Sequence, residues 1–341
     1  MRIGQNPAKY LKEVARPARV TVAVLNYIPF QSGFYAEALD VLKVCLGSIH
    51  ENTEGEYDLL VFDNGSAPEV QAYLLEEHQE GRIQYLVLSE KNLGKGGAWN
   101  VILSGAPGEI IAYTDSDAYF YKGWLPRSLQ LLETFPNVGM VTARPFRTKE
   151  EYSTATVAWA EQTPGVSVER GHFIPWEVFL EFDRSLGQSD EEIRAHYDST
   201  SDVRLTRDGV QAIVGASHWQ FVTRKETIAQ FLPFAMDRPM GQVKQLDQRM
   251  NAAGFLRLMP TEPLAMNMSN TLRQAQGDAL QQAPGTRAAL PPLPLGEGQG
   301  EGSSRSKQPH RKKRPLLDLP PVKKVLLSLY DAIFRWYYDR S

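Results

Sequence analysis

The sequence predicts an α/β fold with a largely parallel sheet, and two patterns support this prediction. Short apolar runs alternate with segments of helical periodicity from Val20 to about residue 146. Polar residues directly follow several of these runs, as in "YTDSDAYF", where Asp115 and Asp117 come after the run Ile110 to Tyr113. Two carboxylates at the end of a buried strand indicate either an ordinary turn or a cation site, because unpaired buried carboxylates are costly.

The individual elements follow from the spacing of the apolar residues. Strands are expected at 20–25, 57–66, 83–89, 109–115 and 139–146. Helices are expected at 35–51, 69–80, 95–106 and 123–135. The pattern weakens between about 150 and 210, where irregular or helical insertions are expected. A strand, a turn, a strand and a helix follow within 209–231, and a helix, a stop at Gly254 and a short strand lie within 243–260.

Composition limits the class of protein. The chain has 341 residues and a net charge of -3, which gives no electrostatic preference for nucleic acid. Its one cysteine, Cys45, excludes a disulfide framework and fits a reducing compartment, so we expect a cytoplasmic protein. The N-terminal residues lack the apolar core of a signal peptide, and no apolar run has the length of a membrane span.

Ligands of parallel α/β sheets bind at the carboxyl ends of the strands. Asp63 follows one predicted strand, although Asp-Asn-Gly-Ser at 63–66 is also an ordinary turn composition. The glycine-rich turn at 92–97 either packs a helix tightly or brings backbone N–H groups to a phosphate. Asp115 and Asp117 suit Mg²⁺ or Mn²⁺, and they equally suit an Asx-type turn.

The order of these signals is more specific than any of them alone. A strand ending at Asn26, a strand ending at Asp63, an Asn-Leu-Gly turn and a strand leading into Asp-x-Asp follow one another. This order resembles the family-2 nucleotide-sugar glycosyltransferases of the GT-A fold, over about residues 19–271 and most clearly across 57–146. The segment "QLDQRMNAAGFLRL" resembles the acidic catalytic segment of that family, and "PLAMNMSNTL" falls where relatives often carry His-x-Gly-Asn.

The resemblance implies a role for each matching residue. Asp63 would bind the base or ribose of the nucleotide, and Asp247 would be the general base. Asp117 would be the main ligand of Mn²⁺ or Mg²⁺, with Asp115 near the ribose or the water shell of the metal. Asn267 stands at the position of a frequent metal-ligating histidine, and an amide oxygen can bind a hard cation without adding charge. The remaining nucleotide-sugar candidates are Asn26, Asn92, Gly94, Lys95 and Arg249.

The expected activity is metal-dependent, inverting transfer of a sugar from a nucleoside diphosphate sugar, with a UDP-sugar favoured. The acceptor would be a glycan, a lipid-linked molecule or a small molecule, and family analogy suggests polysaccharide biosynthesis. His218 and Trp219 could stack on the acceptor, or serve as a structural histidine and a core tryptophan. The alternatives are an inactive nucleotide-sugar-binding protein and, less favoured, a sugar nucleotidyltransferase.

The C-terminal part differs in composition. Residues 1–18 form an N-terminal extension, 19–271 the catalytic domain, and 272–315 a disordered Gly/Pro-rich basic linker. Residues 316–341 have the apolar periodicity of an amphipathic helix. Together with the basic run at 311–314, this helix either contacts the inner face of a membrane through 311–341 or docks on the catalytic domain.

Overall fold

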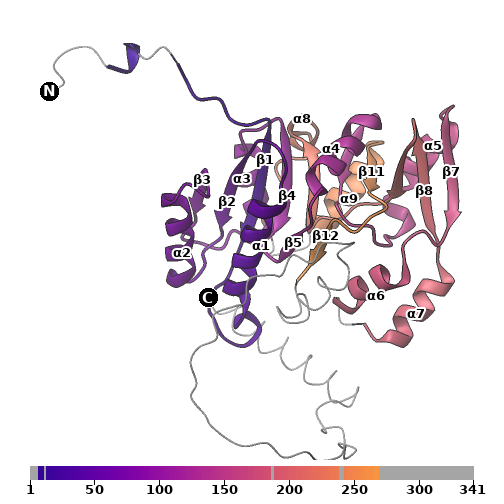
Figure 1. Ribbon diagram of the computed structural model, residues 1–341, viewed down its shortest axis with the longest axis horizontal. Helices are drawn as coiled ribbons and strands as arrows, with labels where there is room; N and C mark the ends of the chain where they lie inside the picture. The colour runs from indigo at the N-terminus through magenta and orange to yellow at the C-terminus, as the bar shows by residue number, and fades with distance from the viewer. Residues whose placement is uncertain (1–6, 11–12, 186–187, 238–241, 269–341) are drawn as a thin grey trace, which may run out of the picture. The chain divides into compact units, whose positions relative to one another are not determined.

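The computed structural model describes residues 7–10, 13–185, 188–237 and 242–268 (Figure 1). The predicted linker and C-terminal helix at 272–341 lie outside the described residues, so the choice between membrane contact through 311–341 and docking on the catalytic domain stays open. Within the described ranges, no helix is both long enough and apolar enough to cross a membrane.

A ten-stranded sheet forms the centre of the molecule, with the order β3-β2-β1-β4-β10-β6-β11-β9-β8-β7. Its first four strands are parallel to one another, and β10 runs antiparallel between β4 and β6. The strands are β1 (Val20–Asn26), β2 (Tyr57–Asp63), β3 (Tyr85–Leu88), β4 (Ile110–Asp115), β6 (Val138–Val141), β7 (Val166–Gly171), β8 (Asp202–Arg207), β9 (Val210–Val214), β10 (Gln220–Arg224) and β11 (Leu256–Met259).

Helices cover both faces of the sheet, as Figure 1 shows. The alternation of β1 demonstrates this directly, because Val22 packs in one core cluster and Ala23 in the other. Burial on both faces explains why β1 reads as an unbroken apolar run. The helices are α1 (Ala38–Asn52), α2 (Pro68–Gln79), α3 (Gly94–Gly105), α4 (Trp124–Thr134), α5 (Thr154–Gln162), α6 (Trp176–Ser185), α7 (Asp190–Ser199), α8 (Lys225–Ala229) and α9 (Gln242–Ala252), with 3-10 turns at Pro7–Tyr10, Gly33–Tyr35 and Glu150–Tyr152.

The predicted fold class is confirmed: it is α/β, with a large and mostly parallel sheet flanked by helices. Every strand and helix expected before residue 146 is present, with ends shifted by a few residues. The expectation of irregular or helical insertions between 150 and 210 was incomplete, because β7 and β8 extend the sheet there. Strand β7 was missed because it is an edge strand whose Glu169 and Arg170 obscure the apolar alternation.

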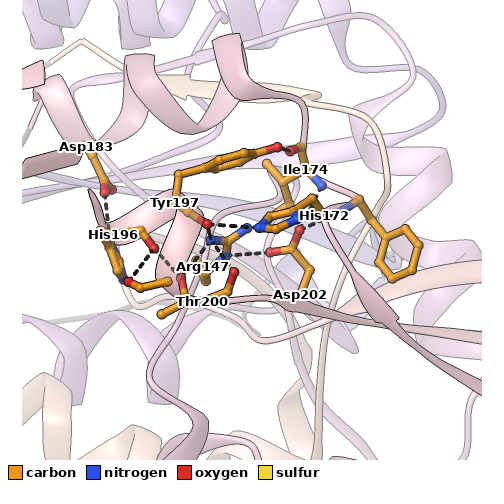
Figure 2. A network of polar contacts seen from close by, with 10 residues as sticks. Arg147, His172, Ile174, Asp183, His196, Tyr197, Thr200 and Asp202 are labelled. Carbon is orange, nitrogen blue, oxygen red and sulfur yellow. Dashed lines mark hydrogen bonds and ion pairs between the residues drawn. The ribbon is translucent and has the colours of Figure 1, made fainter. Parts of the chain in front are cut away.

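A buried ion pair holds the region between β6 and β8 together, and Figure 2 shows its surroundings. Arg147 Nε donates to Asp202 Oδ1 at 2.7 Å, and Asp202 Oδ2 accepts from the backbone N–H groups of Phe173 and Ile174. The Arg147 guanidinium also donates to the carbonyl oxygen of Tyr197 and lies over its ring. The pair thus connects the loop after β6 to the ends of α7 and β8.

A separate two-stranded sheet joins two distant parts of the chain. Strand β5 (Ala118–Phe120) pairs antiparallel with β12 (Ala265–Asn267), so that Asn267 lies opposite Ala118. The N–H of Phe120 donates to Ser48 Oγ on α1, which fixes the small sheet against that helix. The pairing brings Asn267 beside the Asp-Ser-Asp loop.

Candidate active site

The ends of β1, β2 and β4 bring the predicted site residues to one edge of the sheet. Asn26 is the register partner of Asp63, and Leu25 is the register partner of Asp115. The backbone N–H of Ser116 donates to the carbonyl oxygen of Leu25, which continues the contact beyond the end of β4. Parallel pairing therefore places Asn26, Asp63 and Asp115 at neighbouring strand ends.

Asp63 is fully buried and accepts several hydrogen bonds from the protein. Its Oδ1 accepts from Asn26 Nδ2 at 2.8 Å, and its Oδ2 accepts from the Ser66 N–H and from Gln71 Nε2. These donors compensate the cost of burying the carboxylate. They also fix the loop after β2, whose Asn64 lies at the same strand end.

The loop after β2 is tied to the glycine-rich turn before α3. Asn64 Nδ2 donates to Asn92 Oδ1 at 2.9 Å, and Asn64 Oδ1 accepts from the Leu93 N–H. Gly65 has a φ of +87°, and a Cβ there would lie 3.2 Å from the backbone N of Asn92. Asn92 Oδ1 in turn accepts from the Gly94 N–H at the start of α3. The two turns therefore form one rigid rim beside Asp115.

Lys95 and Tyr113 bind the two oxygens of the Asp115 carboxylate. Lys95 Nζ lies 2.7 Å from Oδ2, and the Tyr113 hydroxyl donates to Oδ1 at 2.5 Å. Lys95 Nζ also lies over the rings of Trp99 and Tyr113, at 5.5 and 5.9 Å from their centroids. Lys95, one of the predicted nucleotide-sugar candidates, is therefore the counter-ion of Asp115.

Asp117 has a carboxylate oxygen without a hydrogen-bond partner among the described residues. The side chain is partly exposed, but its Oδ1 is buried and unpaired. Burial, with the nearby Asp115 charge, raises the pKa of Asp117 to about 6, and Lys95 opposes this shift. The Asp117 carbonyl oxygen accepts from the N–H of Met268, which places the end of β12 next to this loop.

The donor set fits a hard divalent cation in chemical type. Asp117 supplies a buried, unpaired carboxylate oxygen, and Asn267 lies at the adjacent position of β12. In the described ranges, no group of three or more His, Cys, Asp or Glu side chains could hold a metal. A cation here would therefore be held by Asp117, Asn267 and ligand oxygens rather than by a full set of acidic side chains.

The predicted general base lies in a second cluster, on α9. Asp247 is 6% exposed, and its Oδ1 accepts from Arg257 Nη2 at 2.5 Å. Arg257 also donates to the carbonyl oxygens of Ala216 and Tyr152, and burial lowers its pKa. His218 Nδ1 lies 3.6 Å from Asp247 Oδ2. The site thus contains a buried carboxylate between an arginine and a histidine.

The two clusters are connected through the turn before β10. The carbonyl oxygen of Trp219 accepts from the Asp115 N–H at 2.8 Å, so His218 is next in sequence to a residue that contacts the strand end. His218 has 34% of its side chain exposed, whereas Trp219 is 6% exposed and belongs to the core. Arg249 lies elsewhere: its Nη1 donates to the Phe231 carbonyl oxygen, and its guanidinium covers that ring.

Two important contacts were not predicted from the sequence. Arg257 lies in the short strand predicted within 243–260, and an arginine inside a buried strand indicates a charged partner. Tyr113 was read only as the end of an apolar run, although a tyrosine hydroxyl that is buried requires a partner. Both residues bind a carboxylate that the sequence had singled out.

Comparison with known proteins supports the order of these motifs. Residues 33–196 match the family described as Glycosyl transferase family 2. The match contains Asp63, Asn92, Asp115 and Asp117, and it ends before His218.

Two similar proteins are also named as glycosyltransferases. An uncharacterized glycosyltransferase of Rickettsia conorii is 30% identical over 96 residues, which are 28% of this chain and 15% of that protein. An uncharacterized glycosyltransferase of Nostoc is 23% identical over 100 residues, which are 29% of this chain and 31% of that protein. The chain thus matches less than a third of the length of these relatives.

Two solved structures show similarity at low identity. The mannosyltransferase PcManGT from Pyrobaculum calidifontis, solved with GDP-Man and Mn²⁺, is 16% identical with a TM-score of 0.42, over 79% of this chain and 62% of that one. TarS residues 1–349 from S. aureus is 12% identical with a TM-score of 0.43, over 78% of this chain and 66% of that one.

Proposed function

We propose that this chain, whose residues 33–196 match glycosyl transferase family 2, transfers a sugar from a nucleoside diphosphate sugar to an acceptor hydroxyl. One observation carries the proposal. The Asp115 and Asp117 carboxylates, the Lys95 ammonium and the N-terminus of α3 meet at the carboxyl edge of the parallel strands. This combination of two anions, a cation and the N-terminal turn of a helix suits a diphosphate and its counter-ion.

The donor would lie along the rim formed by the ends of β1, β2 and α3. Asn26, Asn64 and Asp63 are already connected by hydrogen bonds, so they would present a fixed surface to the nucleoside. Lys95 and the N-terminal turn of α3, after its first N–H, would bind the phosphates. We keep a UDP-sugar as the favoured donor, which rests on the family resemblance.

Mn²⁺ or Mg²⁺ would be held by Asp117 and Asn267, with the donor phosphates completing its shell. When bound, such a cation neutralises the diphosphate leaving group as a Lewis acid. Asp115 would take part chiefly through charge, because Lys95 and Tyr113 bind both of its oxygens. The chain itself would orient the donor.

The acceptor would enter beside His218, and the cluster of Asp247 would accept its proton. Attack by the acceptor hydroxyl from the face opposite the leaving group would invert the anomeric centre. We propose a glycan or lipid-linked acceptor. The family resemblance supports this class of acceptor, and the partly exposed His218 at the edge of the cluster is accessible to it.

A second candidate is a nucleotide-sugar-binding protein without turnover. The observation that favours it is the burial of Asp247, which is 6% exposed and has its Oδ1 bound by Arg257, so an acceptor hydroxyl would have little access to the carboxylate. Asn267 also favours this candidate, because its amide adds no negative charge to the metal site.

Release of nucleoside diphosphate from UDP-glucose, UDP-galactose, UDP-N-acetylglucosamine and GDP-mannose, measured with and without Mn²⁺, tests the proposal. We expect metal-stimulated release from one donor, with loss of turnover but retention of donor binding in Asp247→Asn. Donor binding without release by the wild-type chain would support the second candidate. If the wild-type chain neither binds a donor nor releases nucleoside diphosphate, both candidate functions are contradicted.

A further inference from the structure

We propose that His218 is the residue that accepts the proton of the acceptor hydroxyl, and that Asp247 orients and stabilises it. This inference rests on the proposed glycosyl transfer. Its basis is the contact between His218 Nδ1 and Asp247 Oδ2, which are 3.6 Å apart. Nδ1 is buried and has no hydrogen-bond partner among the described residues, although a third of the side chain is exposed. The exposed part of the ring is therefore available to a ligand.

The surroundings of Asp247 leave it little access to an acceptor. The residue is 6% exposed, and Arg257 binds its Oδ1 at 2.5 Å. The remaining oxygen, Oδ2, faces the imidazole of His218. An acceptor hydroxyl would thus meet the histidine before it met the carboxylate.

Arg257 is a positioning residue in this arrangement. Its guanidinium binds Asp247 and the carbonyl oxygens of Ala216 and Tyr152, and its side chain is 1% exposed. These contacts fix the carboxylate in one orientation. Because Arg257 neutralises Asp247 in the resting state, the carboxylate can accept a neutral histidine N–H without a net buried charge.

The position of His218 relative to the donor edge supports the role. Its neighbour Trp219 accepts a hydrogen bond from the Asp115 N–H, and Gln220 is the register partner of Thr114 on β4. On its other side, the Ser217 N–H donates to Thr142 Oγ1 at 2.7 Å. The turn is therefore anchored on both sides of the histidine, directly beside the strand that ends at Asp115.

The neutral imidazole carries its proton on Nδ1, which faces Asp247, and Nε2 is the free base. The acceptor oxygen forms a bond to the anomeric carbon while the bond from that carbon to the diphosphate oxygen breaks. The diphosphate leaves with the electron pair, and the hydroxyl proton moves to Nε2. The imidazolium formed in this way lies beside the Asp247 carboxylate, which stabilises it.

The first test compares His218→Gln and His218→Ala with the wild type in release of nucleoside diphosphate from the donor panel with Mn²⁺. We expect kcat to fall about 100-fold or more in both, with donor affinity unchanged, since general-base catalysis contributes about that much. Added imidazole should restore turnover in His218→Ala only. His78→Gln, an exposed histidine on α2, is the matched control and should behave as the wild type.

A His218→Gln variant within about threefold of the wild-type kcat would overturn the inference while leaving the proposed function intact. Absence of release by the wild type would instead contradict the proposed function. In that case long-range ¹H–¹⁵N NMR still tests the interaction of His218 with Asp247, because it shows which ring nitrogen carries the proton. We expect the Nδ1–H tautomer in the wild type and its loss in Asp247→Asn, and an Nε2–H tautomer in the wild type would overturn the inference.

Discussion

Lys95 Nζ lies 2.7 Å from Asp115 Oδ2, and both side chains are largely buried. The first acid of the Asp-x-Asp pair is therefore neutralised from within the chain. The lysine is the second residue of α3 and follows the Asn-Leu-Gly turn that Asn64 holds in place. As a result, the strand end carries one uncompensated carboxylate, that of Asp117, rather than two.

Lys95→Met should therefore bind Mn²⁺ more tightly than the wild type in the absence of nucleotide. Removing the ammonium exposes a second carboxylate to the cation, and we expect roughly a 3- to 10-fold gain in affinity. Binding of a nucleoside diphosphate should become weaker because a phosphate partner is lost. Calorimetric titration with each ligand measures both effects.

Lys91→Met is the matched control for this prediction. Lys91 is exposed in the same turn, and its replacement removes one positive charge without touching Asp115. Mn²⁺ affinity in this variant should match that of the wild type. An equal gain in both variants would show that the effect is a general change of net charge.

Replacing Asp117 with Asn should stabilise the metal-free protein at neutral pH and abolish Mn²⁺ binding. The folded state raises the pKa of Asp117 from 3.8 to about 6, so the group disfavours folding when it is ionised. The gain should be at most about 3 kcal/mol above pH 6, and it should vanish below about pH 4, where both states are protonated. Urea unfolding at several pH values measures it.

The same pKa gives the pH dependence of metal binding. Because a carboxylate must be ionised to bind a cation, Mn²⁺ affinity should rise between pH 5 and 7 and then level off. Asp208→Asn, at an exposed position, is the control and should leave both the stability profile and Mn²⁺ binding unchanged. A stability gain for Asp117→Asn that did not vary with pH would contradict the assignment.

The sequence predicted the parallel half of the fold because each strand there is a continuous apolar run followed by a helix. It did not predict β5 and β12, since strands of three residues carry no periodic signal and their partners are far apart in the chain. At the site, Asp63, Asp115 and Asp117 could be identified from their strand ends, and Asp247 from the family resemblance. The pairing of Asp115 with Lys95 and of Asp247 with Arg257 could not be predicted, because side-chain pairing across elements depends on tertiary packing.

Gly65→Ala should destabilise the protein by about 2 kcal/mol and weaken donor binding. The position has a φ of +87°, and a Cβ there would contact the backbone of Lys91 and Asn92 at 3.2 Å. Gly81→Ala is the matched control, with a φ of +77° and no atom within 4 Å of the added Cβ. Gly81→Ala should show only the cost of the positive φ. Thermal unfolding measures the loss of stability, and titration with a nucleoside diphosphate measures the loss of binding.

Arg147→Met should destabilise the protein by about 3–5 kcal/mol, because it leaves the buried Asp202 carboxylate without its cation. The Arg147 side chain is 5% exposed and that of Asp202 is 1% exposed (Figure 2). Arg184→Met breaks the exposed pair with Asp190 and should cost less than about 1 kcal/mol. Urea unfolding of both variants checks the contrast, and similar losses would contradict it.

The position of β10 has a consequence for the order in which the protein can be assembled. This strand lies between β4 and β6 but is synthesised about 80 residues after β6. During synthesis, the edges of β4 and β6 that pair with β10 therefore stay unpaired until residues 220–224 leave the ribosome. A nascent chain stopped at residue 196 would contain the whole family-matched segment and still lack the strand that joins the two halves of its sheet.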